Sequence, residues 1–172
     1  AARLDPSADK QALARRYFDF AVALLQPAAP RLIALGGFSG TGKSTVAAIL
    51  AGRISARVLR SDVIRKRQFG VAPETRLSGD SYTTEATAHV YATLVGQARA
   101  ALAAGCSVVI DAVSARPDER ARFIALAEEC GVPFAGIWLE AVPEILLARI
   151  AARRNDASDA DAAILRKQLD AD

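Results

Sequence analysis

Residues 36–45 read Gly-Gly-Phe-Ser-Gly-Thr-Gly-Lys-Ser-Thr, and residues 37–44 match the phosphate-binding P-loop pattern Gly-x4-Gly-Lys-Ser/Thr at every fixed position. The glycines allow the backbone to curl so that its N–H groups face phosphate oxygens. Lys43 is expected to reach the β- and γ-phosphates of a nucleotide, and the Ser44 hydroxyl is expected to ligate Mg²⁺. The motif therefore predicts a site for ATP and Mg²⁺.

The sequence on either side of the motif is of the kind that a P-loop needs. Residues 31–36 form a short apolar run of strand length, and residues 44–51 are apolar at helical spacing. A strand, a glycine-rich loop and a helix then follow one another, and the positive end of the helix dipole faces the bound anion. We expect the nucleotide to contact Gly37, Phe38, Ser39, Gly40, Thr41, Gly42, Lys43, Ser44 and Thr45.

The bulk composition is that of a folded domain. The chain has 172 residues, of which 52% are hydrophobic and 24% charged, which argues against disorder. It has no apolar run of membrane-spanning length and no secretory signal at its start, and we interpret Cys106 and Cys130 as free, buried thiols of a reducing compartment. These features predict a cytoplasmic protein without a membrane partner. The chain contains no methionine, so we expect a processed chain or a fragment of a longer one.

The hydrophobic pattern predicts alternating strands and helices. An Ala/Leu-rich helix over residues 7–26 and a proline linker form an N-terminal region, 1–30, ahead of a domain over 31–172. Strands are expected at 31–36, 56–60, 107–111 and 134–140, with apolar runs that suit burial on both faces. Helices are expected at 43–54, from 62, at 83–104, 117–130 and 143–154, with a last helix N-capped by Ser158. This order predicts an α/β fold, a three-layer α/β/α sandwich around a parallel sheet.

Three of these strands end in residues that carry chemistry. In a parallel sheet, ligands bind beyond the carboxyl ends of the strands, so the P-loop, Asp62 and Asp111 are expected to line one crevice. We favour Asp62 as the carboxylate that accepts a hydroxyl proton, with Arg65 one helical turn later on the same face. The alternative for Asp62 is an N-cap. Asp111 ends an apolar strand and is expected to hold Mg²⁺ with Ser44, although acceptor binding and a plain polar strand end remain open.

Basic residues near two helices have a structural and a functional interpretation. Arg149, Arg153 and Arg154 are either cations at a helix C-terminus or a lid, near residues 149–161, that closes over ATP and stabilises the transition state. The cluster Arg57, Arg60, Arg65, Lys66 and Arg67 is either a solvated helix start or a site for an anionic acceptor. The net charge of +3 is too small to indicate nucleic-acid binding by itself.

Together these segments resemble P-loop kinases. The resemblance rests on the segments GGFSGTGKST, LRSDVIRKR, VVIDA and RIAARRNDASDAD. It is to kinases of the polynucleotide-kinase, gluconate-kinase and zeta-toxin types, and it covers about residues 31–165. The resemblance implies ATP and Mg²⁺ binding by the P-loop residues, Asp62 as general base, Arg65 as a contact to acceptor or phosphate, Asp111 in the metal or acceptor site, and a lid with Arg149, Arg153 and Arg154. Such kinases usually have a fifth strand after the lid, and this chain ends at Asp172 with only a helix.

More narrowly, the chain is similar to the C-terminal ATP-binding half of bacterial bifunctional aminoglycoside phosphotransferase/ATP-binding proteins. The helix ARRYFDFAVALL and the proline linker that follows it resemble the junction in those fusions, which implies a fused or neighbouring phosphotransferase-like domain as a partner. The name describes a fusion and says little about an antibiotic substrate.

These residues favour an ATP-dependent kinase for a hydroxyl of a small molecule. Lys43, Asp62, Arg65 and Arg153 are its expected catalytic residues. Two alternatives stay open: a polynucleotide 5′-hydroxyl kinase that uses the basic cluster, and a nucleotide-binding module that regulates a fused partner. No motif in the sequence identifies the acceptor.

Overall fold

A computed structural model describes residues 8–25, 28–153 and 156–170. Its centre is a sheet of β1 (Leu32–Gly36), β2 (Arg57–Arg60), β3 (Val108–Asp111) and β4 (Phe134–Trp138). The strands lie in the order β2-β3-β1-β4, and every neighbouring pair is parallel. The predicted parallel α/β sheet is therefore confirmed, and the P-loop strand β1 lies between two others.

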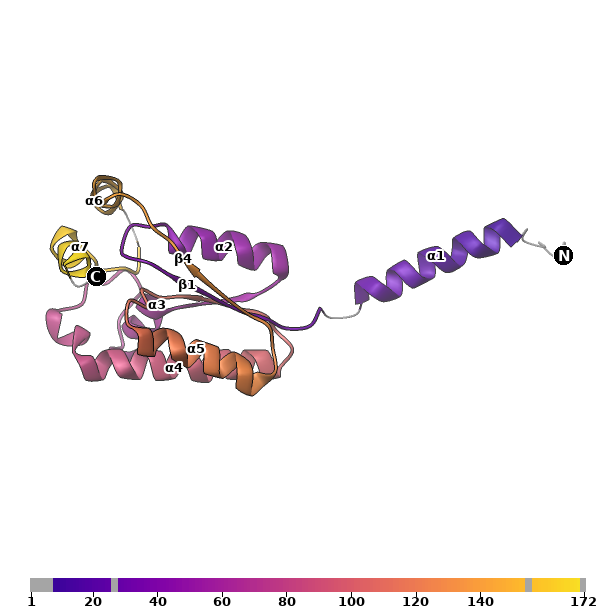
Figure 1. Ribbon diagram of the computed structural model, residues 1–172, viewed down its shortest axis with the longest axis horizontal. Coiled ribbons are helices and arrows are strands. Elements are labelled where there is room, and N and C mark those ends of the chain that lie inside the picture. The colour runs from indigo at the N-terminus through magenta and orange to yellow at the C-terminus, as the bar shows by residue number, and fades with distance from the viewer. Residues whose placement is uncertain (1–7, 26–27, 154–155, 171–172) are drawn as a thin grey trace.

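Helices cover the two faces of this sheet (Figure 1). On one face, α2 (Lys43–Ile54) packs Ala47 and Ala51 against Ile33, Leu35 and Val109. On the other face, α4 (Thr84–Ala103) and α5 (Pro117–Cys130) contribute the larger core cluster. Its largest fully buried members are Leu32, Val90, Leu94, Val108, Ile110, Phe123 and Leu126. Each cluster joins the sheet to a layer of helices on one of its faces, which gives the three layers that the alternating pattern predicts.

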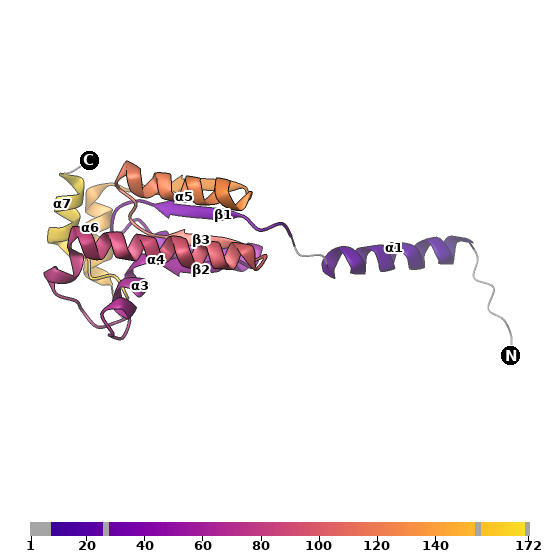
Figure 2. The same cartoon turned by 90° about the horizontal axis from the view of Figure 1, so that it is seen from below.

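The remaining helices gather at the carboxyl end of the sheet. They are α3 (Ser61–Gln68), the 3-10 helix η1 (Gly79–Tyr82), α6 (Pro143–Ala152) and α7 (Ala162–Leu169). Figures 1 and 2 show α6 and α7 side by side at this end, beyond the strands rather than over a face of the sheet. Helices thus enclose the carboxyl end of the sheet, which is the end where parallel sheets bind their ligands.

The N-terminal helix α1 (Ala8–Leu25) stands apart from this body in Figure 1. Its aromatic side chains are largely exposed, at 68% for Tyr17, 60% for Phe18 and 63% for Phe20. The division into an N-terminal region, 1–30, and a domain over 31–172 stays a prediction.

The structure corrects three details. Burial of all strands on both faces is wrong for the two edge strands: Ala135, Gly136 and Ile137 of β4 and Arg57 of β2 are exposed, whereas the central strands β1 and β3 are almost fully buried. The N-cap of the last helix is Asp161, whose Oδ1 accepts from the amides of Ala163 and Ile164 at 3.0 Å. Neither cysteine is fully buried, since Cys106 is exposed and Cys130 half-buried, although both are free as expected.

None of the described helices combines the length and the apolar composition needed to cross a membrane.

Candidate active site

The P-loop backbone has the left-handed dihedral angles that its glycines make possible. The φ angles are 129° at Gly37, 88° at Gly40 and 95° at Gly42. A Cβ at Gly40 would lie 2.9 Å from the carbonyl oxygen of Leu146, and one at Gly37 would collide with the carbonyl oxygen of Leu139. Gly37 and Gly40 are thus required by both backbone angle and space, whereas Gly42, the second fixed glycine of the motif, is required by its backbone angle alone.

The lysine of the motif lies against its own loop. Lys43 Nζ donates to the carbonyl oxygens of Gly37 at 2.7 Å and Phe38 at 2.9 Å. Burial lowers the pKa of the Lys43 ammonium from its ordinary value, against the opposing effect of the Asp111 and Asp62 carboxylates. This partly desolvated ammonium lines a cavity at the carboxyl end of the sheet, and no carboxylate is hydrogen-bonded to it among the described residues.

The proposed metal ligands Ser44 and Asp111 are in direct contact. Ser44 Oγ donates to Asp111 Oδ2 at 2.6 Å, and Arg60 Nε donates to the same oxygen at 3.2 Å. The described residues contain no cluster of three or more acidic, histidine or cysteine side chains that could hold a metal alone. A hydroxyl and one carboxylate still suit Mg²⁺, which keeps several waters and takes ligands from substrate phosphates.

Asp62 lies in the first turn of α3, where β2 ends. The N-cap of this helix is Arg60, and α3 has no side-chain cap, so the interpretation of Asp62 as an N-cap is wrong. Burial and the nearby Asp111 carboxylate raise the pKa of Asp62, while a hydrogen bond with Ser158 opposes the rise. A carboxylate with a raised pKa is a suitable proton acceptor.

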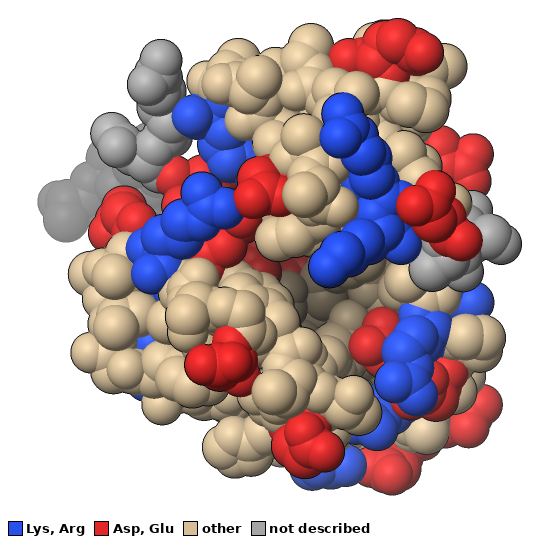
Figure 3. Space-filling model, turned by 90° about the vertical axis from the view of Figure 1, so that its left-hand side faces the viewer, with Lys and Arg blue, Asp and Glu red and all other residues tan. Residues whose placement is uncertain are grey.

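These residues share one cavity of about 530 Å³ at the carboxyl end of the sheet. Its lining combines the P-loop and the start of α2 with residues from α3, β3, α6 and the segment after α6. The lining residues are Ser39, Gly40, Thr41, Gly42, Lys43, Ser44, Thr45, Val46, Ser61, Asp62, Asp111, Val113, Arg149, Arg153, Asp156 and Ser158. Figure 3 looks onto this end of the molecule and shows a hollow bordered by both basic and acidic side chains.

Phe38 contributes to the P-loop through its backbone. Its carbonyl oxygen accepts from Thr41 Oγ1 at 2.8 Å and from Lys43. Its ring packs edge-on against Trp138 with 5.7 Å between centroids, outside the lining of the cavity.

Arg65 lies on α3 with Asp62, but the structure does not bring it into the cavity. The side chain is buried, with Nη1 donating to the Ser81 carbonyl oxygen at 2.7 Å and Nη2 to Thr87 Oγ1 at 3.3 Å. Its guanidinium also lies 4.6 Å from the centre of the Tyr82 ring. Arg65 therefore ties α3 to η1 and α4.

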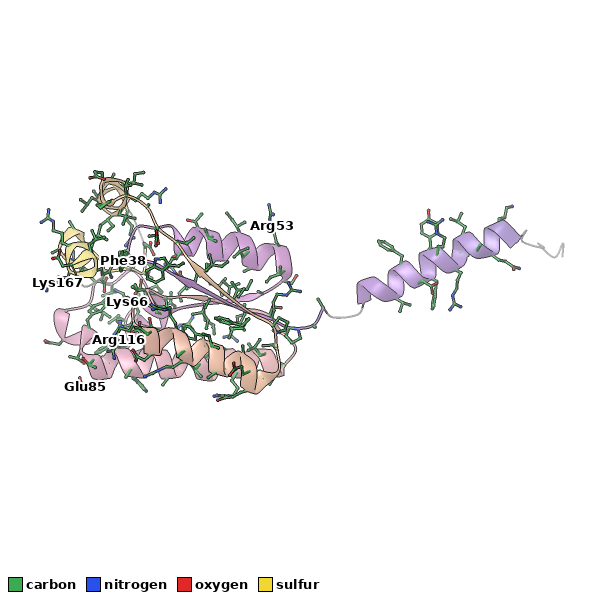
Figure 4. The ribbon with its side chains drawn as sticks, in the orientation of Figure 1. Phe38, Arg53, Lys66, Glu85, Arg116 and Lys167 are labelled. Atoms are coloured by element: carbon green, nitrogen blue, oxygen red, sulfur yellow. The ribbon has the colours of Figure 1, made fainter. Side chains whose placement is uncertain are left out.

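Lys66 is likewise turned inward. It is 1% exposed and donates to both carboxylate oxygens of Asp159, at 2.5 and 2.6 Å, and to the carbonyl oxygen of Thr75. Asp159 also accepts from the Tyr82 hydroxyl at 2.6 Å and from the Leu77 amide at 3.0 Å. Figure 4 shows Lys66 inside the body, whereas Arg53 extends outward. This cluster fastens the segment after α6 to α3 and to the loop before η1.

Two of the three arginines proposed for the lid line the cavity. Arg149 Nη1 lies 3.3 Å from the Gly40 carbonyl oxygen, and Arg153, the C-cap of α6, pairs with Asp156 at 3.4 Å. Arg153 Nη1 is buried and has no hydrogen-bond partner in the described part of the chain. Arg154 lies outside the described residues.

Three residues had no predicted role at the site: Asp156, Ser158 as a neighbour of Asp62, and Gln168, whose Oε1 accepts from the Ser39 amide at 3.0 Å. Arg60 was predicted only as a member of the basic cluster, and its contact with Asp156 was not predicted. Gln168 is 129 positions from its partner, and Asp156 is 96 from Arg60. Only the fold brings them together, so no local pattern could have identified them.

The chain matches known proteins over most of its length. A family model described as an AAA domain matches residues 32–171. Uncharacterized proteins of Mycobacterium tuberculosis and Mycobacterium bovis are 33% identical over 153 residues, which is 87% of this chain and 31% of theirs. The chain thus spans about a third of the length of these relatives. An adenylyl-sulfate kinase of Myxococcus xanthus is 34% identical over 122 residues, 67% of this chain and 60% of that one.

Solved structures share the fold. A crystal structure of a putative kinase from Chloroflexus aurantiacus has a TM-score of 0.61 and 24% identity, covering 73% of this chain and 67% of that one. A gluconokinase from Sinorhizobium meliloti has a TM-score of 0.53 and 22% identity, with 83% and 74% covered. By the match over residues 32–171, which includes the P-loop and every strand of the sheet, this chain belongs to the AAA-domain family.

Proposed function

We propose that the chain is an ATP-dependent phosphotransferase that moves the γ-phosphate to a hydroxyl of a small molecule. One observation carries the proposal: a single cavity brings the P-loop, the Ser44–Asp111 pair and the Asp62 carboxylate together. A phosphate cradle, a metal site and a proton acceptor are the parts that phosphoryl transfer to a hydroxyl needs. The kinase names of its relative from Myxococcus xanthus and of the structural neighbours add support.

Each group has a distinct role in this proposal. The P-loop amides and Lys43 hold the β- and γ-phosphates, and Arg149 and Arg153 stabilise the charge of the migrating phosphoryl group. Bound Mg²⁺, held by Ser44 and Asp111, would neutralise phosphate charge. Asp62 accepts the proton of the acceptor hydroxyl, and α6 with the segment after it excludes water as a lid. Arg65 serves the reaction indirectly, by fixing α3 and therefore Asp62.

A second cavity, of about 390 Å³, is the proposed entrance for the acceptor. It shares Arg153, Asp156 and Ser158 with the first cavity and continues to Glu74 and Arg76. Four carboxylates and two guanidinium groups line it, namely those of Glu74, Asp156, Asp159, Asp161, Arg76 and Arg153. This balance favours an acceptor without negative charge.

The basic cluster supports a small molecule over a polynucleotide. Three of its five members face inward: Arg60 pairs with Asp111 and Asp156, Lys66 pairs with Asp159, and Arg65 is buried. Arg57 and Arg67 are left exposed, which gives a nucleic-acid backbone few cations to bind.

The test is transfer of labelled γ-phosphate from ATP–Mg²⁺ to separate panels of sugars, amino sugars, nucleosides and 5′-hydroxyl oligonucleotides. Label on a sugar or amino-sugar acceptor is the expected result. Label on oligonucleotides alone would overturn the choice of acceptor. Tight ATP binding without any labelled product would contradict the proposal and favour a nucleotide-binding regulatory module.

A further inference from the structure

Asp156 lies between two arginines at the edge of the cavity. Its Oδ1 accepts from Arg60 Nη2 at 2.7 Å, and its Oδ2 lies 3.4 Å from Arg153 Nε. The three side chains are between 21% and 28% exposed. The Asp156 carboxylate is thus engaged by two guanidinium groups and would itself repel a phosphate.

Arg60 continues this arrangement toward the metal site. Its Nε donates to Asp111 Oδ2 at 3.2 Å, the oxygen that also accepts from Ser44 Oγ. Side chains from α2, β3, β2 and the segment after α6 therefore form one uninterrupted series of contacts. The series joins the Ser44–Asp111 pair at one end to Arg153 at the other.

Arg153 lies at the end of this series. Its Nη1 is buried, lacks a hydrogen-bond partner among the described residues, and belongs to a side chain that lines the cavity. The positive charges of Arg153 and Arg60 both lower the pKa of the Lys43 ammonium, so the three cations lie close to one another around the cavity. Asp111 offsets the charges of Lys43 and Arg60, and among the described residues Asp156 is the carboxylate that contacts Arg153. Loss of the Asp156 charge would therefore leave Arg153 repelled by its cationic neighbours.

Asp156 retains its charge in this position. Burial tends to raise its pKa, but the hydrogen bond from Arg60 and the charges of Arg60 and Arg153 outweigh this effect and hold the pKa below the ordinary value. The carboxylate is therefore ionised at neutral pH.

We propose that Asp156 is a positioning residue that holds Arg153 against the cavity and couples it, through Arg60, to the Ser44–Asp111 pair. The inference rests on the proposed function for its kinetic consequence, while the placement of Arg153 stands without it. A partly exposed ion pair of this kind contributes little to folding stability. The function that we propose for this ion pair is therefore to fix the position of the Arg153 guanidinium.

The first experiment reads the placement of Arg153 without requiring turnover. Phenylglyoxal modifies accessible arginines, and peptide mass spectrometry gives the rate at Arg153 in the wild-type chain, D156N and the control E129Q. Glu129 pairs with Arg99 on the surface, so E129Q also removes one partner of an ion pair. We expect Arg153 to be modified about tenfold faster in D156N than in the wild-type chain, and at the wild-type rate in E129Q. An unchanged rate in D156N would overturn the proposal, whether or not the chain transfers phosphate.

The second experiment asks whether Asp156 acts through Arg153. We expect D156N and R153M each to lower kcat about tenfold or more, D156E to recover part of the loss, and the double variant to resemble R153M within about twofold. Additive losses in the double variant would show that Asp156 acts by another route and would overturn the coupling. A wild-type chain without transfer activity would refute the proposed function instead, and the modification rates would still decide the placement.

Discussion

The two walls of the cavity are built in different ways. The P-loop wall, residues 37–45, is shaped by glycines with positive φ and by the start of α2, all within one short stretch. The opposite wall is formed by Asp156 and Ser158. Their segment, residues 156–161, is held by Arg60 and Lys66, which reach the carboxylates of Asp156 and Asp159 across more than ninety positions of sequence. The backbone conformation of the P-loop wall is therefore specified locally, and the opposite wall depends on the completed fold.

The largest effect is expected on the P-loop wall. Lys43→Met should lower kcat/KM about 10³–10⁵-fold, because a cation that contacts the migrating phosphoryl group has an effect of that size. Steady-state kinetics measure the loss, with the exposed Lys10→Met on α1 as the matched control. A loss below about tenfold would remove Lys43 from the chemistry.

On the opposite wall the largest effect is on stability. Lys66→Met should lower the free energy of unfolding by about 3–5 kcal/mol, because it leaves the Asp159 carboxylate buried without its partner. Urea unfolding measures the change. Arg76→Gln, which breaks the exposed pair with Asp161, should cost about 1 kcal/mol or less. Similar losses in both variants would contradict the claim that buried pairs hold this wall.

A single methyl group tests the local construction of the P-loop. Gly40→Ala should weaken ATP binding by roughly 1–3 kcal/mol, because its φ of 88° is strained for alanine and its Cβ approaches Leu146. Gly52→Ala, in the last turn of α2 with open space around its Cβ, is the control and should leave ATP binding unchanged. Calorimetric titration with ATP–Mg²⁺ distinguishes them, and equal affinities would refute the geometric argument.

The smallest effect is a displacement of the pH profile. The Asp62 carboxylate is the active form, so kcat/KM should fall as the pH drops through its raised pKa. Ser158→Ala removes a hydrogen bond that lowers this pKa, and the acid limb should therefore move to higher pH. An acid limb that stays in place, or moves to lower pH, would show that Ser158 does not lower the pKa of Asp62.

Most of the fold could be predicted from the sequence, because buried parallel strands and the helices between them leave strong local patterns. The P-loop and the pairing of Ser44 with Asp111 followed from a motif and from the rule that parallel strands end at one edge. The orientation of Arg65 and Lys66 did not follow. Arg65 was expected to face the site beside Asp62, and Lys66 looks like a surface cation, but the packing of η1 and Asp159 turns both inward away from the cavity. The cap at Asp161 was missed because Ser158 and Asp161 are equally suitable by residue type.

The central claim is that Asp62 serves the chemistry and not the binding of nucleotide. The most direct test measures ATP–Mg²⁺ affinity and single-turnover γ-phosphate transfer in the same samples of wild type, Asp62→Asn and the distant control Asp19→Asn. We predict that Asp62→Asn binds ATP within about threefold of wild type and transfers phosphate about 10²–10⁴-fold more slowly. Transfer at the wild-type rate in Asp62→Asn would contradict the account.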